Sequence, residues 1–203
     1  MLLGLVAFCL LSCNKSIDNI KDYYKYINSP SSGLVKMKNI GNISFSMKYI
    51  PSDFYLYKAC KEFPNISKDS LKKEYENSFN FILKIGPSEA ADVKFDIMTE
   101  TVSSLAEFQE QVLTVNFGLQ KFIRLKMGNR EIAPVLVETE NVYGLTQHRL
   151  INVVFAKEEF EEDWTNNNEI DITFNDEIYG TGKHHFLFYK KDLNNIPELD
   201  ITK

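Results

Sequence analysis

The sequence lacks an excess of basic residues. Its 23 Lys and Arg are outnumbered by 28 Asp and Glu, which gives a formal net charge of −5 at pH 7. A protein that binds nucleic acid neutralises phosphates with basic side chains. The composition therefore argues against a nucleic-acid partner, and the mildly acidic balance favours solubility without indicating a particular ligand.

Hydrophobic runs of spanning length and cysteines are also scarce. The apolar run at the start of the chain covers residues 1–11. As a helix it would reach roughly 17 Å, well short of the roughly 30 Å of a bilayer core. Its length instead suits the apolar region of a secretory signal peptide, which is removed from the mature protein.

The residues that close this run carry a resemblance to a known class of signal. Leu10-Leu11-Ser12-Cys13 resembles the lipobox of bacterial lipoprotein signal peptides. The resemblance implies cleavage before Cys13, a diacylglyceryl group on its sulfur and, usually, an acyl group on its new amino terminus. It covers the first thirteen residues, and it departs from the family's pattern in that no Lys or Arg precedes Lys15. Beyond these residues there is a general likeness to small uncharacterised bacterial lipoproteins with sandwich domains.

The resemblance implies a signal peptide over residues 1–12, and after it we expect a lipidated tether or short amphipathic helix over 13–33 and one β-rich globular domain over 34–203. Two acyl chains anchor a protein stably, whereas one binds marginally. A membrane is therefore an expected partner. An aspartate after the cysteine retains such proteins in the inner membrane; here that position is Asn14, which favours the outer membrane.

The segment after the lipobox has two interpretations. Ile17, Ile20, Tyr24 and Ile27 fall at helical spacing, with Ser16 as an N-cap. A helix here would lie against the membrane or against the domain. The alternative is a flexible tether, and the Ser- and Pro-containing end of the segment has linker composition in both cases.

Cysteine usage agrees with export. Cys9 would leave with the signal and Cys13 would be lipidated, so the domain would keep the single thiol of Cys60 and no intramolecular disulfide. A lone cysteine among aromatic residues is typical of a small buried residue more than of a nucleophile.

Alternating apolar and polar residues predict strands in much of the remaining chain. The predicted strands cover residues 43–49, 79–85, 93–97, 122–127, 132–137, 150–155, 170–174 and 186–189. Gly128-Asn129 predicts a hairpin turn. A capping box from Ser104 to Glu107 predicts a helix with Leu105, Phe108 and Val112 on one face. Residues 68–75 are a weaker helical candidate, and 52–63 are ambiguous.

These elements predict a mainly β chain of the α+β class. The spacing of strands and turns favours an antiparallel β-sandwich with one or two short helices. An immunoglobulin-like arrangement is one form that such a sandwich takes.

Motifs for metals, phosphates and catalysis are weak. His184 and His185 are adjacent, so on a strand they face opposite sides and cannot share one ion; His148 is the third histidine. The acidic run 157–163 lacks an EF-hand pattern, and Gly180 to Lys183 lacks the spacing of a phosphate loop. No metal, cofactor or catalytic residue is predicted, although a carboxylate pair formed in the fold stays an alternative.

Aromatic residues are the last feature that bears on function. Tyr23, Tyr24, Tyr26, Tyr55, Tyr57, Tyr143, Trp164 and Tyr179 exceed what a sandwich core needs. Such side chains suit protein or glycan recognition, or else they pack on the sheet faces. The sequence therefore predicts a lipid-anchored, non-enzymatic envelope protein that binds or assembles with another macromolecule at the cell surface or in the periplasm, either an envelope protein or a glycan. A carbohydrate- or small-ligand-binding module is the first alternative and a carboxylate-pair hydrolase the second.

Overall fold

The computed structural model describes residues 16–91, 95–141 and 146–200, and the predicted lipidation site Cys13 lies outside them. In these residues the chain forms two antiparallel sheets, of five and four strands, a short parallel pair of strands and six α-helices. The fold is therefore α+β.

The larger sheet has the strand order β2-β3-β4-β8-β7. Its strands are β2 (Val35–Ile40), β3 (Ile43–Ile50), β4 (Ser78–Pro87), β8 (Arg149–Ala156) and β7 (Leu136–Thr139). Its register aligns the apolar residues on one face: Met47 lies opposite Leu83, and Leu83 lies opposite Ile151. All three side chains are buried, because alternation along each strand places every second residue on the core face.

The smaller sheet has the order β10-β9-β5-β6. Its strands are β10 (Gly182–Tyr189), β9 (Glu169–Asp176), β5 (Ile123–Met127) and β6 (Arg130–Ile132). The β5–β6 hairpin turns at Gly128, whose φ of 57° is in the left-handed region that glycine adopts without steric cost.

Aromatic rings join the core faces of the two sheets. Phe81 on β4 lies 5.2 Å from Phe188 on β10, measured between ring centroids. Phe45 on β3 lies 6.0 Å from Phe174 on β9 and stacks on His184 of β10 at 4.4 Å. The two sheets thus share one hydrophobic core.

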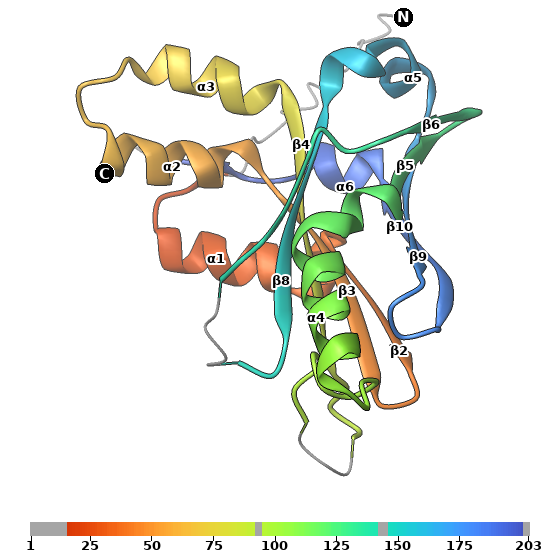
Figure 1. Cartoon of the computed structure of the whole chain (residues 1–203). Helices are drawn as coiled ribbons and strands as arrows, with labels where there is room; N and C mark the ends of the chain where they lie inside the picture. Colours follow the sequence, from red (N-terminus) through yellow and green to blue (C-terminus); the bar gives the residue numbers. More distant parts are fainter. Residues whose placement is uncertain (1–15, 92–94, 142–145, 201–203) are drawn as a thin grey trace, which may run out of the picture.

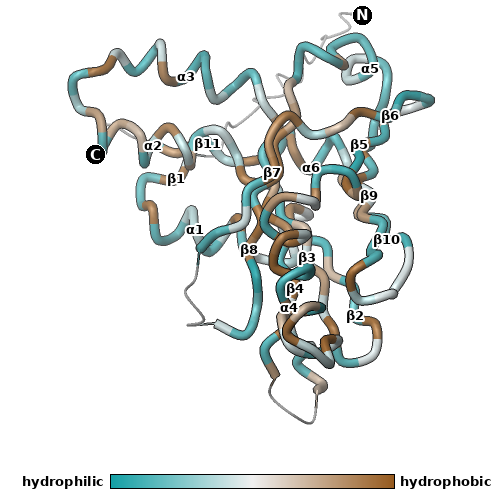
Figure 2. The backbone as a smooth tube through the Cα atoms, viewed as in Figure 1, coloured by the Kyte–Doolittle hydropathy of each residue, from teal (hydrophilic) through white to brown (hydrophobic). Residues whose placement is uncertain are grey.

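The helices flank the two sheets. They are α1 (Ile20–Asn28), α2 (Ser52–Glu62), α3 (Lys68–Glu76), α4 (Leu105–Leu113), α5 (Glu161–Asn166) and α6 (Lys190–Asn194). Figure 1 shows α1, α2 and α3 together on the left of the larger sheet and α4 in front of it. In Figure 2, α3 and α5 are largely teal, as expected for helices with much exposed polar surface, whereas α4 carries several brown positions.

The chain before β2 packs onto the domain. Asn19 caps α1 by accepting a hydrogen bond from the Lys21 N–H, and Tyr23 and Ile27 on α1 are fully buried. The short strand β1 (Ser16–Ile17) pairs in parallel with β11 (Glu198–Leu199). Both ends of the described chain therefore meet beside α1 and α2, as Figure 2 shows.

Most of the expected strands are confirmed. The patterns at 43–49, 79–85, 150–155, 170–174 and 186–189 lie in β3, β4, β8, β9 and β10, and the hairpin turn at Gly128 is present. The capping box opens α4, and the candidate at 68–75 is α3. The ambiguous stretch at 52–63 is α2.

Four expectations are wrong. Of the strand predicted at 93–97, residues 93 and 94 lie outside the described residues, and residues 95–97 are not a strand, although Ile97 is buried. Residues 132–137 are not one strand, because Pro134 has no N–H to donate and the chain passes from β6 in one sheet to β7 in the other. The described residues hold six α-helices instead of one or two, and their strand orders show no immunoglobulin-like topology.

Phe81 tests the shared core. Its ring contacts Tyr49, Phe155 and Phe188 at centroid distances of 5.5, 6.1 and 5.2 Å. We expect Phe81→Ala to lower the free energy of unfolding by about 3–5 kcal/mol, because it leaves a cavity between the sheets. Urea unfolding followed by circular dichroism measures this change. The control Phe63→Ala, at a residue that is 47% exposed, should change it by less than about 0.5 kcal/mol.

Candidate functional site

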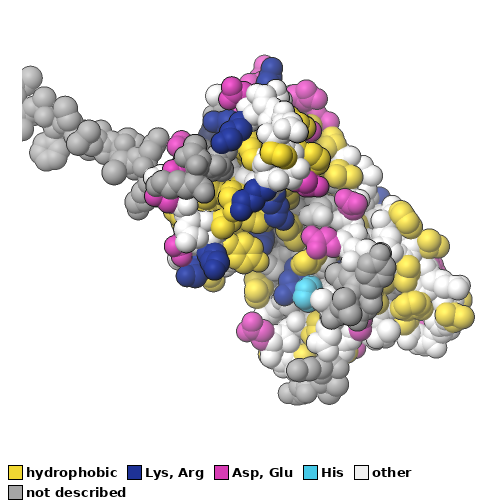
Figure 3. Space-filling view, turned by 90° about the vertical axis from the view of Figure 1, so that its left-hand side faces the viewer, with side chains coloured by type: hydrophobic (Ala, Val, Ile, Leu, Met, Phe, Trp, Pro, Cys, Tyr) yellow, Lys and Arg dark blue, Asp and Glu magenta, His cyan; other side chains and the backbone are white. Residues whose placement is uncertain are grey.

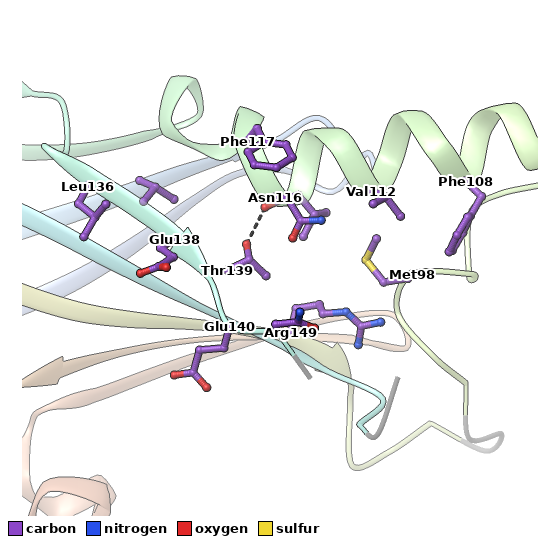
Figure 4. A pocket seen from close by; sticks show the side chains of 13 residues that line it. Met98, Phe108, Val112, Asn116, Phe117, Leu136, Glu138, Thr139, Glu140 and Arg149 are labelled. Atoms are coloured by element: carbon purple, nitrogen blue, oxygen red, sulfur yellow. Dashed lines mark hydrogen bonds between the residues drawn. The ribbon is translucent and has the colours of Figure 1, made fainter. Parts of the chain in front are cut away.

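A hollow between α4 and β7 is the best candidate for a binding site. It has a volume of about 720 Å³, and we call it the α4–β7 pocket. Its apolar lining comes from the following side chains of α4, the turn after it, β7 and the loop before α4: Met98, Phe108, Val112, Val115, Phe117, Leu136 and Val137. Figure 4 shows Phe108 and Val112 pointing from α4 toward Met98. Ligand sites commonly have this size and this predominantly apolar character.

The helical wall of the pocket is fixed by its own cap. Ser104 accepts a hydrogen bond from the Glu107 N–H, and Glu107 accepts one from the Ser103 N–H at 2.6 Å. These bonds satisfy amide donors that the start of any helix leaves free. At its far end, α4 continues as a π-helical turn, η2 (Thr114–Gly118), and a short 3₁₀ turn, η3 (Leu119–Lys121). Such π turns often occur at functional sites, because the widened helix changes which side chains face outward.

The strand wall of the pocket depends on the passage of the chain between the sheets. Val135, directly after Pro134, donates its N–H to Val154 of β8 at 2.8 Å and so starts the pairing of β7. Thr139 on β7 donates its hydroxyl to the Val115 carbonyl of η2 at 2.6 Å, the dashed line in Figure 4. This hydrogen bond joins β7 to η2 and so holds the two walls of the pocket together.

Arg149 is the principal polar group among the inner lining residues. Its guanidinium donates to both carboxylate oxygens of Asp96, at 3.0 and 3.2 Å, and also to the carbonyls of Thr146 and His148. The Arg149 side chain is 13% exposed and Asp96 is 31% exposed. Because this ion pair is partly screened from water, it fixes the floor of the pocket with a defined geometry.

Exposed apolar side chains occur at the mouth of the pocket. Of its lining residues, Phe117 is 82% exposed and Leu136 is 48% exposed. Scattered exposed apolar residues are ordinary, but a group of them around an apolar hollow is typical of an interaction site.

Two acidic residues lie on and directly after β7. Glu138 and Glu140 also line the mouth of the pocket. Figure 4 shows the Glu140 side chain pointing away from α4. On that side its negative charge acts on Lys48, whose pKa is lowered by burial and partly restored by Glu140. Glu140 therefore belongs more to the outer sheet face than to the apolar interior of the pocket.

The histidines singled out from the sequence lie elsewhere. On β10, His184 points into the core and is buried, whereas His185 is exposed and pairs with Asp171 at 2.6 Å. Burial lowers the pKa of His184, which accordingly favours its neutral form. The adjacent histidines face opposite sides, as the alternation of a strand requires.

A second polar cluster holds the β9–β10 turn. Asp176 is buried and accepts the N–H groups of Ile178, Tyr179 and Thr181. The Thr181 hydroxyl contacts the Asp176 carboxylate and lies 2.7 Å from His184. The threonine lies between the acid and the histidine, so the histidine does not link a nucleophile to an acid as in a catalytic triad. The glycine-containing stretch from Gly180 to Lys183 is thus a structural turn.

Cys60 lies apart from the pocket. It packs half-buried beside Leu56, Ala59 and Leu71 between α2 and α3.

The acidic run and the remaining aromatic candidates also lie apart from it. Residues 157–163 form the turn η4 (Lys157–Glu159) and the start of α5, where Asp163 pairs with Arg130 at 3.0 Å. Trp164 packs edge-on against Phe79 at 5.0 Å with Lys190 over its ring. Tyr23 is buried, Tyr24 is 53% exposed, and Tyr143 lies outside the described residues. The other aromatic candidates, Tyr26, Tyr55, Tyr57, Trp164 and Tyr179, are partly buried.

Within the described part of the chain, no three His, Cys, Asp or Glu side chains are grouped so that they could hold a metal ion. None of the helices in residues 16–91, 95–141 and 146–200 has the length and apolar content needed to cross a bilayer.

Sequence analysis did not single out the α4–β7 pocket. A usable signal was present, because residues 105–119 carry more apolar positions than one buried helical face requires. Leu113 and Phe117 are four residues apart and off the face of Phe108 and Val112. A helix that is apolar on two faces has one face left for a second partner.

Comparison with known proteins adds little to this geometry. No model of a protein family matches the sequence, and no curated protein matches it. Among solved structures, the chain is similar to a protein from Burkholderia pseudomallei K96243 described as a novel protein of unknown function. The two share 8% sequence identity over 89% of this chain and 90% of that chain, with a TM-score of 0.38. Similarity at this level carries no argument about what the chain does.

The Arg149–Asp96 pair gives a direct test of the pocket floor. We expect Arg149→Met to lower the free energy of unfolding by roughly 1–3 kcal/mol, because Asp96 loses its charged partner in a partly buried position. Adding Asp96→Asn should then cost less than it does alone, since the partner is already absent. Urea unfolding of the two single variants and the double variant measures this coupling. Strictly additive costs would show that the two side chains do not stabilise each other.

Proposed function

We propose that this chain is a lipid-anchored, non-enzymatic protein of the bacterial cell envelope that acts as a binding or assembly module. The anchor is the diacylated Cys13, and the outer membrane is the favoured location because Asn14 follows it. The binding site is the α4–β7 pocket, and its partner is an envelope protein that inserts an apolar side chain or segment.

One observation carries the choice of partner. The apolar lining of the pocket continues onto the surface, where Phe117 and Leu136 are 82% and 48% exposed. A small ligand held inside a pocket does not need apolar surface outside it. A protein partner does, since protein interfaces combine a central pocket filled by an anchor residue with a surrounding apolar contact area.

A small-ligand-binding module is the second candidate. The volume of about 720 Å³ favours it, because this value falls within the range of small-molecule sites. The glycan form of this alternative depended on a concave cluster around Trp164, and Trp164 instead packs against the core. The hydrolase alternative has no specific support from the pocket, since Glu140 points away from its interior.

The anchor is tested by Cys13→Ala. We expect this variant to lose the lipid and to pass from the membrane fraction into the soluble fraction, because two acyl chains supply the membrane affinity. Fractionation and mass spectrometry of the amino-terminal peptide measure both effects. Cys60→Ala, at the other thiol, should stay at the membrane with Cys13 diacylated. Continued anchorage of the Cys13→Ala protein would sink the proposal.

The binding site is tested by Phe117→Ser. We expect this change to reduce recovery of the co-purifying partner by roughly tenfold, which corresponds to about 1.4 kcal/mol. The reason is the loss of an exposed anchor side chain, while stability should change by less than about 0.5 kcal/mol. The measurement is affinity purification of the lipidated protein from its own membranes, followed by quantitative mass spectrometry. Phe63→Ser is the matched control, because Phe63 is also exposed but lies at the end of α2.

A further variant separates the two candidate functions. Val112→Trp fills the pocket and should also remove the partner. If a bound small molecule, seen by native mass spectrometry, is lost in Val112→Trp and kept in Phe117→Ser, the small-ligand alternative replaces the assembly module. Equal recovery of the same proteins from all variants would exclude the pocket as the site.

A further inference from the structure

A second apolar hollow lies between α1 and α2. Its volume is about 450 Å³, and its apolar lining consists of Ile20 and Tyr24 from α1 with Phe54 and Tyr57 from α2. Three lysines complete the lining: Lys21, Lys25 and Lys58. We call these seven residues the lysine–aromatic patch.

The lysines lie over and around the aromatic rings. The Lys58 ammonium is 4.9 Å from the ring centroid of Phe54, and the neighbouring Lys61 ammonium is 4.7 Å from that of Tyr57. Tyr24 is 53% exposed. Figure 3, which faces this side of the molecule, shows yellow apolar side chains among dark blue Lys and Arg. Aromatic rings with lysines beside them are the side chains that suit the headgroup region of a membrane.

The patch is packed on the domain. The opposite face of α1 buries Tyr23 and Ile27 in the main core, and Phe54 and Tyr57 of α2 pack against the same core. Leu56 and Ala59 of α2 pack with Leu71 of α3 in a separate cluster.

The amino-terminal end of the described chain lies beside this surface. β1 begins at Ser16, and Ile17 and Ile20 pack against the core next to α1. Cys13 is three residues before Ser16, and three residues reach at most roughly 11 Å. A lipid on Cys13 would therefore hold this side of the domain within a short distance of the bilayer.

The charge of the patch differs from that of the chain. The whole sequence has a formal net charge of −5, whereas the patch contributes three lysines and no acidic residue. The nearest acid on α1 is Asp22, which pairs with Lys25 at 3.2 Å and so offsets one of the three charges. The remaining positive charge complements phosphate-bearing anionic headgroups.

We propose that the lysine–aromatic patch docks on the anionic headgroups of the same membrane that holds the lipid anchor. This inference rests on the proposed function, since the anchor supplies the closeness that a weak surface contact needs. Docking orients the domain, because α1 and α2 lie together on one side of the larger sheet, with α4 in front of it (Figure 1).

The test is lysine footprinting of the full lipidated chain in two kinds of vesicle. One is pure phosphatidylcholine, and the other is phosphatidylcholine with phosphatidylglycerol at a ratio of three to one. We expect Lys21, Lys25 and Lys58 to be acetylated roughly fivefold more slowly in the anionic vesicles. The reason is that the electrostatic attraction of one lysine to an anionic surface favours the docked state by about that factor. Raising the salt to 0.5 M should remove the difference, because it shortens the screening length.

Matched variants make the comparison specific. Lys21→Glu with Lys58→Glu should abolish the slower acetylation of Lys25 while the protein stays anchored. The control pair is Lys126→Glu with Lys183→Glu, which changes the net charge equally at exposed positions on β5 and β10. The control should keep the protection of Lys25.

The outcomes separate this inference from the anchor. Equal acetylation in both vesicles would overturn the docking proposal whether or not Cys13 is diacylated. An unmodified Cys13 would refute the anchor, whereas the comparison of the two vesicles tests the patch. Protection that already occurs in detergent and grows with protein concentration would show a second copy of the chain on the patch, and it too would overturn the proposal.

Discussion

The contact of aromatic rings between the two sheets is the interaction on which the rest of the structure depends. Phe45 and Phe81 from the larger sheet meet Phe174 and Phe188 from the smaller one. Neither sheet has another way to remove this apolar face from water, and burial of such rings is the dominant favourable contribution to folding. Once the sheets are joined, the positions of β7, α4 and the two chain ends follow from their connections to them.

The α4–β7 pocket arises where a chain segment moves from one sheet to the other. β6 ends at Ile132, Pro134 interrupts the hydrogen-bond ladder, and β7 then pairs with β8. The segment between α4 and β5 lies beside β7 at this point. The Thr139–Val115 hydrogen bond fixes the distance between this segment and β7. The pocket is thus a product of topology more than of any single residue.

The charges of the chain are separated over its surface in a way that its net charge conceals. The acidic run 157–163 leads into α5, far from the lysines of α1 and α2 (Figure 1). Lys21 and Lys58 come from different helices and act together because both helices pack on the same side of the domain. An overall charge of −5 therefore coexists with a local surface that suits an anionic partner.

The sequence by itself determined the local features. Period-two alternation predicted β3, β4, β8, β9 and β10, because a half-buried strand needs that pattern, and Ser104 with Glu107 predicted the start of α4 through contacts a few residues apart. The lipobox resemblance is likewise local and remains a prediction. Only the tertiary structure decided the strand order, the division of residues 132–137 between two sheets, and the meeting of Arg149 with Asp96. It also decided both surfaces proposed for binding. These features join residues tens of positions apart, and no spacing along one element encodes which distant segments the core brings together.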